Sequence, residues 1–314
     1  MLTSLLTTEG FRFEHRPEPV PDRTEVVLAP TAVGLCEGDT FLYRTRAESA
    51  VRPLVVGHEA TGIVTGVGNG VRDVRVGDRV ATLATQALAE RVAVDADLLA
   101  PVAAHVPDTA ALGEPIACCV HALARISIRP DDTVAVVGCG FMGLVCVALA
   151  RLAGARVTAI EPIESRRGAA LDMGADAAID PAAATPEALG AAVGPQATVI
   201  EAAGNQAALD TATALTSSHG TLVVLAYHQA GGGRRTVAMR DWNYRALTVV
   251  NGHVRDRAQK AAALRTAMDH VNHGRLDVGG LVRTWPLAGV EAAIRATFEQ
   301  RDDVVKAAIA LPAP

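Results

Sequence analysis

The sequence has few aromatic residues, few lysines and few cysteines, and it lacks long hydrophobic runs. Aromatic residues make up 3% of the 314 residues, and the only lysines are Lys260 and Lys306. The formal net charge is −5, and the arginines are spread along the chain without a polybasic block. These features argue against nucleic acid or an anionic membrane as the main partner. No apolar stretch approaches the roughly 20 residues that span a membrane.

The five cysteines do not form the pattern of a secreted, disulfide-bonded domain, and their odd number leaves at least one unpaired. Such scarcity is typical of a reducing compartment. The first residues, MLTSLLTTEGFRFEHR, contain neither the basic segment nor the long apolar run of a signal peptide. We therefore expect a cytoplasmic protein that acts on a small molecule.

Two patterns divide the chain. Residues 1–110 contain short apolar strands separated by glycine and aspartate turns, which predicts a barrel-like β unit. After Pro130, apolar strands alternate with helical segments, which is typical of a parallel sheet with helices on both faces. We expect an α/β fold with a catalytic domain at 1–120 and 256–314 and a dinucleotide-binding domain at 121–255.

The segment GCGFMG follows the apolar stretch TVAVV and begins a predicted helix. In this context Gly138 makes a tight turn, Gly140 lets the backbone approach a pyrophosphate, and Gly143 allows close packing of helix and strand. We expect the N–H groups of the helix that begins at Phe141 and Met142 to face the phosphates. The motif predicts a Rossmann dinucleotide site.

Glu161 ends the next predicted strand, 23 residues after Gly138. A carboxylate at this place accepts hydrogen bonds from a ribose hydroxyl and repels a 2′-phosphate, which favours NAD over NADP. Arg166 and Arg167 are the opposing signal, because a nearby arginine can hold a phosphate. The alternative role of both arginines is a solvated first turn of the helix predicted at 164–173.

Three segments carry candidate metal ligands. Cys36 lies in VGLCEGDTF, His58 and Glu59 follow 22 and 23 residues later, and Glu114 lies in the mostly apolar GEPIACCVHAL. A carboxylate buried there without a partner is costly, and a shared cation would stabilise it. Sulfur, imidazole and carboxylate together suit Zn²⁺, and three protein ligands with an open position describe a catalytic site. The alternatives are a small buried thiol and a core histidine.

Over essentially its whole length, the chain resembles the zinc-dependent medium-chain dehydrogenases/reductases. GHEATGIVTGVGNGVRDVRVGDRV follows the zinc signature of the family at every glycine, and VGLCEGD resembles its G-[IV]-C-x-x-D segment. EPIACCVHA followed by GCGFMG is similar to the polyol and threonine dehydrogenase branch. The resemblance implies a GroES-like barrel, a Rossmann domain and one catalytic Zn²⁺ held by Cys36 and His58. It leaves open whether Glu59 or Glu114 is the third ligand or a water-mediated partner.

The chain departs from the family in two places. The lobe with four cysteines that holds a structural zinc in many members is absent, so we expect one zinc per chain. Gly38 and Phe41 stand where alcohol dehydrogenases commonly carry the Ser or Thr and the His of a proton relay. A metal-bound water beside a glutamate is one substitute, and Thr40, Tyr43 and His228 are other candidates.

By resemblance, segments 226–229 and 247–253 close over the nicotinamide. The residues expected to contact it through backbone groups are Ala203, Ala226, Asn251 and His253. Polar side chains in both segments favour a polyhydroxylated substrate such as a polyol or cyclitol, because buried polar partners recognise hydroxyls. The alternative for DWNYRALTVV is a subunit interface.

The resemblance implies hydride transfer between NAD(H) and a secondary alcohol or ketone, with a polyol, a cyclitol or another polar biosynthetic intermediate as substrate. A zinc-free NAD(P)H reductase of the quinone or enoyl type is one alternative. A non-catalytic or redox-silent NAD-binding relative is another. A homodimer or homotetramer is the expected assembly.

Overall fold

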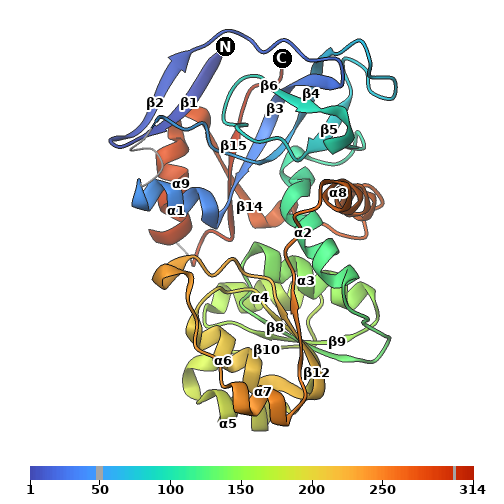
Figure 1. The fold of residues 1–314 in the computed structure, drawn as a ribbon, viewed down its shortest axis with the longest axis vertical. Helices are drawn as coiled ribbons and strands as arrows, with labels where there is room; N and C mark the ends of the chain where they lie inside the picture. Colours follow the sequence, from blue (N-terminus) through green and yellow to red (C-terminus); the bar gives the residue numbers. More distant parts are fainter. Residues whose placement is uncertain (47–51, 300–301) are drawn as a thin grey trace. The chain divides into compact units, whose positions relative to one another are not determined.

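The computed structural model describes residues 1–46, 52–299 and 302–314. It divides into two compact units (Figure 1). Unit 1 comprises Met1–Ala117 and Asp256–Pro314, and unit 2 comprises Cys118–Arg255. In the part of the chain that is described, no helix is both long and apolar enough to cross a membrane.

Unit 1 is built on a seven-stranded sheet in which β14, β15, β3, β4, β5 and β7 are successive neighbours and β6 pairs with β3. A separate hairpin joins β1 to β2. The final strand, β15, pairs antiparallel with β3, and this last segment of the chain belongs to unit 1. The strands are β1 (Leu2–Thr7), β2 (Gly10–His15), β3 (Glu25–Leu35), β4 (Glu59–Val67), β5 (Arg79–Thr82), β6 (Val92–Asp95), β7 (Leu99–Pro101), β14 (Val282–Pro286) and β15 (Lys306–Ala310).

Four α-helices and four short 3₁₀ turns among the described residues belong wholly or partly to unit 1. The α-helices are α1 (Glu37–Thr45), α2 (Gly113–Ala124), which crosses the division between the units, α8 (Arg257–Asn272) and α9 (Val290–Glu299). The short 3₁₀ turns are η1 (Ala96–Leu98), η2 (Asp108–Ala111), η5 (Gly279–Leu281) and η6 (Leu287–Gly289). A core that includes Leu6, Val33, Ile294 and Ile309 joins the hairpin, the sheet and α9. This core fixes the end of β3, where the candidate metal ligands begin.

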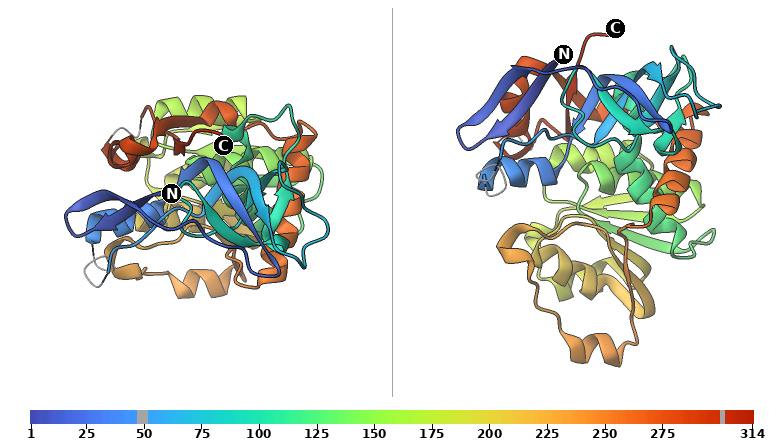
Figure 2. Two further views of the ribbon diagram at one scale, coloured as in Figure 1. Left: turned by 90° about the horizontal axis from the view of Figure 1, so that it is seen from above. Right: turned by 45° about the horizontal axis from the view of Figure 1, so that its top comes forward.

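Unit 2 is a six-stranded parallel sheet with α3 and α4 on one face and α5 and α6 on the other (Figure 2). With β8 counted as the first strand, the spatial order is 3-2-1-4-5-6, the order of a Rossmann fold. The strands are β8 (Thr133–Val137), β9 (Arg156–Ile160), β10 (Ala177–Ile179), β11 (Gln196–Glu201), β12 (Thr216–Val224) and β13 (Thr248–Asn251). The helices are α3 (Phe141–Leu152), α4 (Glu164–Asp172), α5 (Pro186–Val193), α6 (Gln206–Leu215) and α7 (Met239–Tyr244), with 3₁₀ turns η3 (Pro181–Ala183) and η4 (Ala230–Gly233).

Candidate functional site

Cys36 lies at the junction of β3 and α1, where it is the N-cap of the helix. Its Sγ accepts a hydrogen bond from the N–H of Gly38 at 3.1 Å, and Asp39 Oδ2 accepts one from the N–H of Cys36 at 3.0 Å. These reciprocal contacts satisfy two N–H groups that a helix start would otherwise leave unpaired. They hold the thiol at the end of β3.

Cys36, His58 and Glu59 form a compact group of potential metal ligands. One ligand atom from each of the three side chains lies within 4.8 Å of the others, and no other such group of three occurs among the described residues. The pairing of β3 with β4 places Glu59 opposite Gly34, two residues before the cysteine. The strand register therefore assembles the three donors.

The same group contains a buried ion pair that connects it to the last strand. The ammonium nitrogen of Lys306 pairs with Glu59 Oε2, and the side chains are only 7% and 2% exposed. Burial lowers the pKa of Lys306, but the charges of Glu59 and Cys36 outweigh it and raise the pKa above its ordinary value. Glu59 thus lies between the other candidate metal ligands and a buried ammonium group.

The electrostatic surroundings of Cys36 and His58 suit a cation. Burial, followed by the negative charges of Asp39 and Glu59, raises the pKa of the Cys36 thiol well above its ordinary value. Burial lowers the pKa of His58, but the charges of Asp39, Glu59 and Glu114 raise it overall. A thiol, an imidazole and carboxylates that interact in this way are a donor set that fits Zn²⁺.

Two carboxylates lie around the group without belonging to it. Asp39 Oδ1 accepts from the N–H of Gly57 at 3.3 Å and lies 3.9 Å from His58 Nδ1, where it can orient the ring. Glu114, near the start of α2, acts on His58 through its charge and lies outside the group of three. Of the two glutamates that the sequence left open, Glu59 is the one beside Cys36 and His58.

The structure gives hydrogen-bond partners to the three side chains considered as relay candidates. The hydroxyl of Thr40 lies 3.0 Å from that of Thr297, and Tyr43 donates to Glu291 at 2.6 Å. The ring nitrogens of His228 contact Glu201 and Arg235. Each candidate therefore already has a partner within its own unit.

The glycine turn of unit 2 has two sterically crowded glycines, Gly138 and Gly143, and one open side, at Gly140. Gly138 has a φ of +94°, and a Cβ there would lie 2.6 Å from the Cβ of Ala203. A Cβ on Gly143 would lie 1.9 Å from the carbonyl oxygen of Gly138, so α3 packs directly on the turn. A Cβ on Gly140 would meet nothing within 4 Å, and this residue caps α3 without a side-chain hydrogen bond. The open side of the turn fits a pyrophosphate.

Glu161 lies directly behind this turn. Its Oε2 accepts from the N–H of Cys139 at 2.7 Å, and its Oε1 accepts from the N–H of Ile163 at 3.0 Å. Arg167 donates to the carbonyl oxygen of Glu161 at 2.9 Å, while Arg166 is buried on α4. Burial and the charge of Glu161 raise the pKa of Cys139 to about 12, so this thiol stays neutral.

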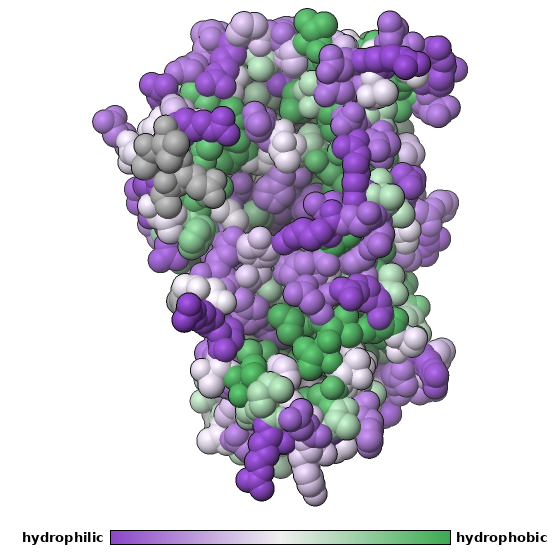
Figure 3. Space-filling model, viewed as in Figure 1, coloured by the Kyte–Doolittle hydropathy of each residue, from purple (hydrophilic) through white to green (hydrophobic). Residues whose placement is uncertain are grey.

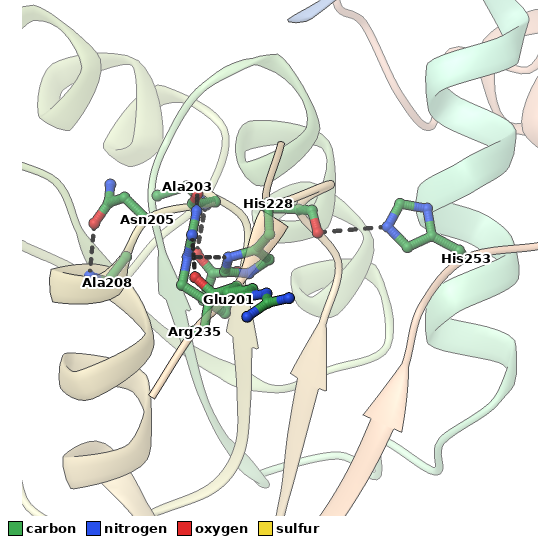
Figure 4. Close-up of polar contacts among 10 residues, drawn as sticks. Glu201, Ala203, Asn205, Ala208, His228, Arg235 and His253 are labelled. Carbon is green, nitrogen blue, oxygen red and sulfur yellow. Dashed lines mark hydrogen bonds and ion pairs between the residues drawn. The ribbon is translucent and has the colours of Figure 1, made fainter. Parts of the chain in front are cut away.

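The residues expected at the nicotinamide lie beside a cavity of about 600 Å³ at the carboxyl ends of β12 and β13. Its lining consists of Arg125, Val224, Ala226, Tyr227, His228, Asn251, His253 and Arg255, and it contains no carboxylate. His253 Nε2 lies 3.4 Å from the carbonyl oxygen of Ala226 (Figure 4). The backbone carbonyl oxygen of Asn251 accepts a hydrogen bond from the guanidinium group of Arg125. Ala203, which was also expected at the nicotinamide, does not line this cavity and lies beside Gly138.

Two segments of the chain match the models of known protein families. The alcohol dehydrogenase GroES-like domain matches residues 22–104, and the zinc-binding dehydrogenase domain matches residues 142–271. The sorbitol dehydrogenase of Gallus gallus is 31% identical over 254 residues, which are 68% of this chain and 71% of that protein. The chain belongs to the zinc-dependent medium-chain dehydrogenase/reductase family.

Other members of this family show how far the similarity extends. The sorbitol dehydrogenase of Bombyx mori is 32% identical over 199 residues, which are 52% of this chain, and the chain spans 57% of the length of that relative. The crystal structure of a putative zinc-binding dehydrogenase from Sinorhizobium meliloti 1021 bound to NADP has a TM-score of 0.85. It is 25% identical, and the match covers 99% of both chains.

Membership of the zinc-dependent dehydrogenase/reductase family confirms the α/β fold, with its GroES-like and Rossmann parts, and the family prediction. Residues 83–91, which join β5 to β6, contain no cysteine. The sequence did not indicate four residues that contact the candidate site residues. Lys306 pairs with Glu59. Glu201 and Arg235 contact His228, and Arg125 contacts Asn251. Only Lys306 had a visible signal, since it is one of two lysines in the chain.

Proposed function

We propose that this chain is an NAD-dependent zinc alcohol dehydrogenase that transfers hydride between the nicotinamide and a secondary alcohol or ketone. The observation that carries the proposal is the approach of thiol, imidazole and carboxylate to within 4.8 Å in a chain that also has an open glycine turn. Relatives named sorbitol dehydrogenase and L-galactonate-5-dehydrogenase support a polyol, a cyclitol or a similar polar intermediate as substrate.

Cys36, His58 and Glu59 are the proposed zinc ligands, and Glu114 contributes negative charge next to them. A bound zinc would act as a Lewis acid that stabilises the charge developing on the substrate oxygen. Asp39 orients the imidazole of His58, and Lys306 holds the carboxylate of Glu59. The protein side chains thus fix the donor geometry before any substrate binds.

NAD is the proposed cofactor, with NADP the less favoured one. Gly138, Gly140 and Gly143 present the start of α3, at Phe141 and Met142, to the pyrophosphate. Glu161 is the proposed acceptor for the ribose hydroxyls, with Arg166 on the following helix. The backbone groups proposed to contact the nicotinamide half belong to Ala203, Ala226, Asn251 and His253.

A homodimer, or a homotetramer built from it, is the proposed assembly. β13 is the last strand of its sheet and carries exposed Val249, and the preceding segment exposes Met239 and Tyr244. Apolar residues gather on the visible face of unit 2, in the lower half of Figure 3. An unpaired strand edge with apolar neighbours favours pairing with a second copy.

We further propose that residues 1–120 and 256–314 form the catalytic domain and residues 121–255 the cofactor domain. The scarcity of cysteine favours the cytoplasm as the compartment.

The proposal is tested by NADH formation with a panel of polyols and cyclitols, with and without a chelator. Cys36→Ser should abolish turnover, whereas the matched variant Cys146→Ser, on α3, should keep it. Turnover that resists the chelator and survives Cys36→Ser would support a zinc-free reductase instead. NADH binding without any turnover would support a non-catalytic relative.

A further inference from the structure

His228 has a backbone conformation that few residues other than glycine adopt. Its φ is +49°, in the left-handed region that glycine occupies without strain. The residue follows β12 at the carboxyl edge of the sheet and lines the cavity of unit 2. A strained backbone beside a cavity points to a role for the residue that offsets the strain.

The side chain of His228 joins a polar chain of three residues, of which Glu201 is buried and His228 and Arg235 are half-buried (Figure 4). Its Nε2 lies 2.7 Å from Glu201 Oε2, and its Nδ1 accepts from Arg235 Nε at 3.0 Å. The Glu201 side chain is 0% exposed and ends β11. Because a buried carboxylate needs partners, the imidazole and the backbone around it stabilise the charge.

The hydrogen bonds determine which ring nitrogen carries the proton. A guanidinium only donates, so Nδ1 must offer its lone pair to Arg235. Nε2 then carries the hydrogen and donates it to Glu201. Both ring nitrogens are engaged, so none is left for a substrate, and His228 acts by holding its neighbours in place.

Those neighbours are the two loops that follow β11 and β12. Glu201 Oε1 accepts from the N–H groups of Ala203 at 3.0 Å and Gly204 at 2.7 Å, and Arg235 donates to the carbonyl oxygen of Gly204 at 2.7 Å. A Cβ on Gly204 would lie 3.3 Å from the Cβ of Ala226. The polar chain therefore fixes both loops against each other.

The first loop also reaches the glycine turn, because Ala203 packs against Gly138. The second loop carries Ala226, which lines the cavity and contacts His253. In a doubly wound sheet, ligands bind at the carboxyl ends of the strands. The three side chains thus lie between the turn proposed for the pyrophosphate and the cavity proposed for the nicotinamide.

We propose that Glu201, His228 and Arg235 form a hydrogen-bonded chain that positions the loops after β11 and β12 for the nicotinamide half of the cofactor. His228 is a positioning residue in this chain, held as the Nε2–H tautomer by Arg235. The inference rests on the proposed NAD-dependent function and adds residues that specifically support the nicotinamide half.

The test compares the binding of NADH with that of ADP-ribose, which lacks the nicotinamide. His228→Gly removes the imidazole at a backbone angle that glycine adopts freely, so the fold should persist. It should raise the Kd of NADH roughly tenfold, the loss expected for hydrogen bonds to a charged group. The Kd of ADP-ribose should change by less than about twofold. Equal weakening of both ligands, or no weakening of NADH, would overturn the proposal.

Two further variants separate positioning from a general effect on folding. His228→Gln can donate to Glu201 and accept from Arg235, so it should bind NADH within about threefold of the wild type. Glu201→Gln turns an amide donor toward either the Nε2–H group of His228 or the N–H groups of Ala203 and Gly204. Because either orientation places donor against donor, it should weaken NADH about as much as His228→Gly. A His228→Gln variant as weak as His228→Gly would contradict the hydrogen-bond assignment.

His219→Gly is the matched control, because His219 is an exposed histidine on β12 with a φ of +59° and lies outside the cavity lining. This control should leave the affinity for both ligands unchanged. If the wild type binds neither NADH nor ADP-ribose, the proposed function itself fails. If the wild type binds both and the His228 variants match it, only the positioning role fails.

Discussion

Lys306, the first residue of β15, forms a buried ion pair with Glu59, the first residue of β4. The two strands are brought together through β3, which lies between them in the sheet. One carboxylate thus serves both as a partner for a buried ammonium group and as a candidate metal ligand. A cation that binds Cys36 and His58 would share Glu59 with Lys306.

Replacement of Lys306 by Met should destabilise the protein, because it leaves Glu59 as an unpaired buried charge. The expected loss is about 3–5 kcal/mol for the metal-free protein. Zinc should recover a substantial part of this loss by supplying the missing positive charge. Urea unfolding with and without zinc measures both effects, and Lys260→Met provides the control at the other lysine. An equal loss with and without zinc would contradict the shared role of Glu59.

Replacement of Gly34 by Ala should disturb the group of ligands from the neighbouring strand. The added Cβ would lie 2.1 Å from Glu59 Oε2 and 3.1 Å from Lys306 Cε, and neither buried group can move freely. We expect at least a tenfold loss in zinc affinity, of the order seen when outer partners of a metal site are changed. Gly168→Ala, on α4 with nothing within 4 Å, is the control and should leave zinc affinity unchanged. Unaltered zinc binding by Gly34→Ala would disprove this geometry.

Replacement of Glu161 by Ala should weaken NADH and reduce discrimination against NADPH. The variant loses the acceptor that holds the N–H groups of Cys139 and Ile163 and the charge that repels a 2′-phosphate. The ratio of the two Kd values should shift toward NADPH by about tenfold. Fluorescence titration with both cofactors measures the ratio. If the ratio stays at its wild-type value, Glu161 does not select the cofactor.

Folding stability should depend on pH through His253. Burial, and then the positive charge of Arg255, lower the pKa of this imidazole, and the contact with Ala226 only partly opposes them. The unfolded chain binds a proton near pH 6.5 that the folded chain rejects, so His253 reduces stability as the pH falls from about 6.5 toward the lowered pKa. The free energy of unfolding of the wild type should therefore fall, relative to that of His253→Gln, between about pH 8 and about pH 5.5. Urea unfolding at the two pH values measures this change. A constant difference would contradict the burial effect.

The sequence predicts most of the fold because its periodic segments are long and well bounded. The helix predicted to begin at Phe141 does begin there, and the helix predicted at 164–173 ends one residue earlier, at Asp172. The helix α1 was missed, since its N-cap is a cysteine rather than one of the usual capping residues. The short helix α5 lies in an alanine-rich stretch that has little periodicity.

The ligand candidates were visible in the sequence, but their partners were not. Cys36, His58 and Glu59 follow recognisable local spacing, and the pairing of β3 with β4 brings them together. Lys306 reaches Glu59 only because the last strand pairs with β3, far away in the sequence. The contact of Glu201 with His228 likewise depends on the parallel neighbours β11 and β12 and on a left-handed backbone. Such pairings follow from tertiary structure, which local patterns do not encode.

X-ray absorption at the zinc edge, on protein loaded with one equivalent of zinc, tests the central claim most directly. We expect about one zinc per chain, bound by one sulfur and otherwise by nitrogen and oxygen, at the distances usual for thiolate and imidazole ligands. Cys36→Ser should remove the sulfur contribution, whereas Cys146→Ser should keep it. A zinc bound by several sulfurs, or no zinc bound at all, would contradict the assignment of Cys36, His58 and Glu59 as the metal site.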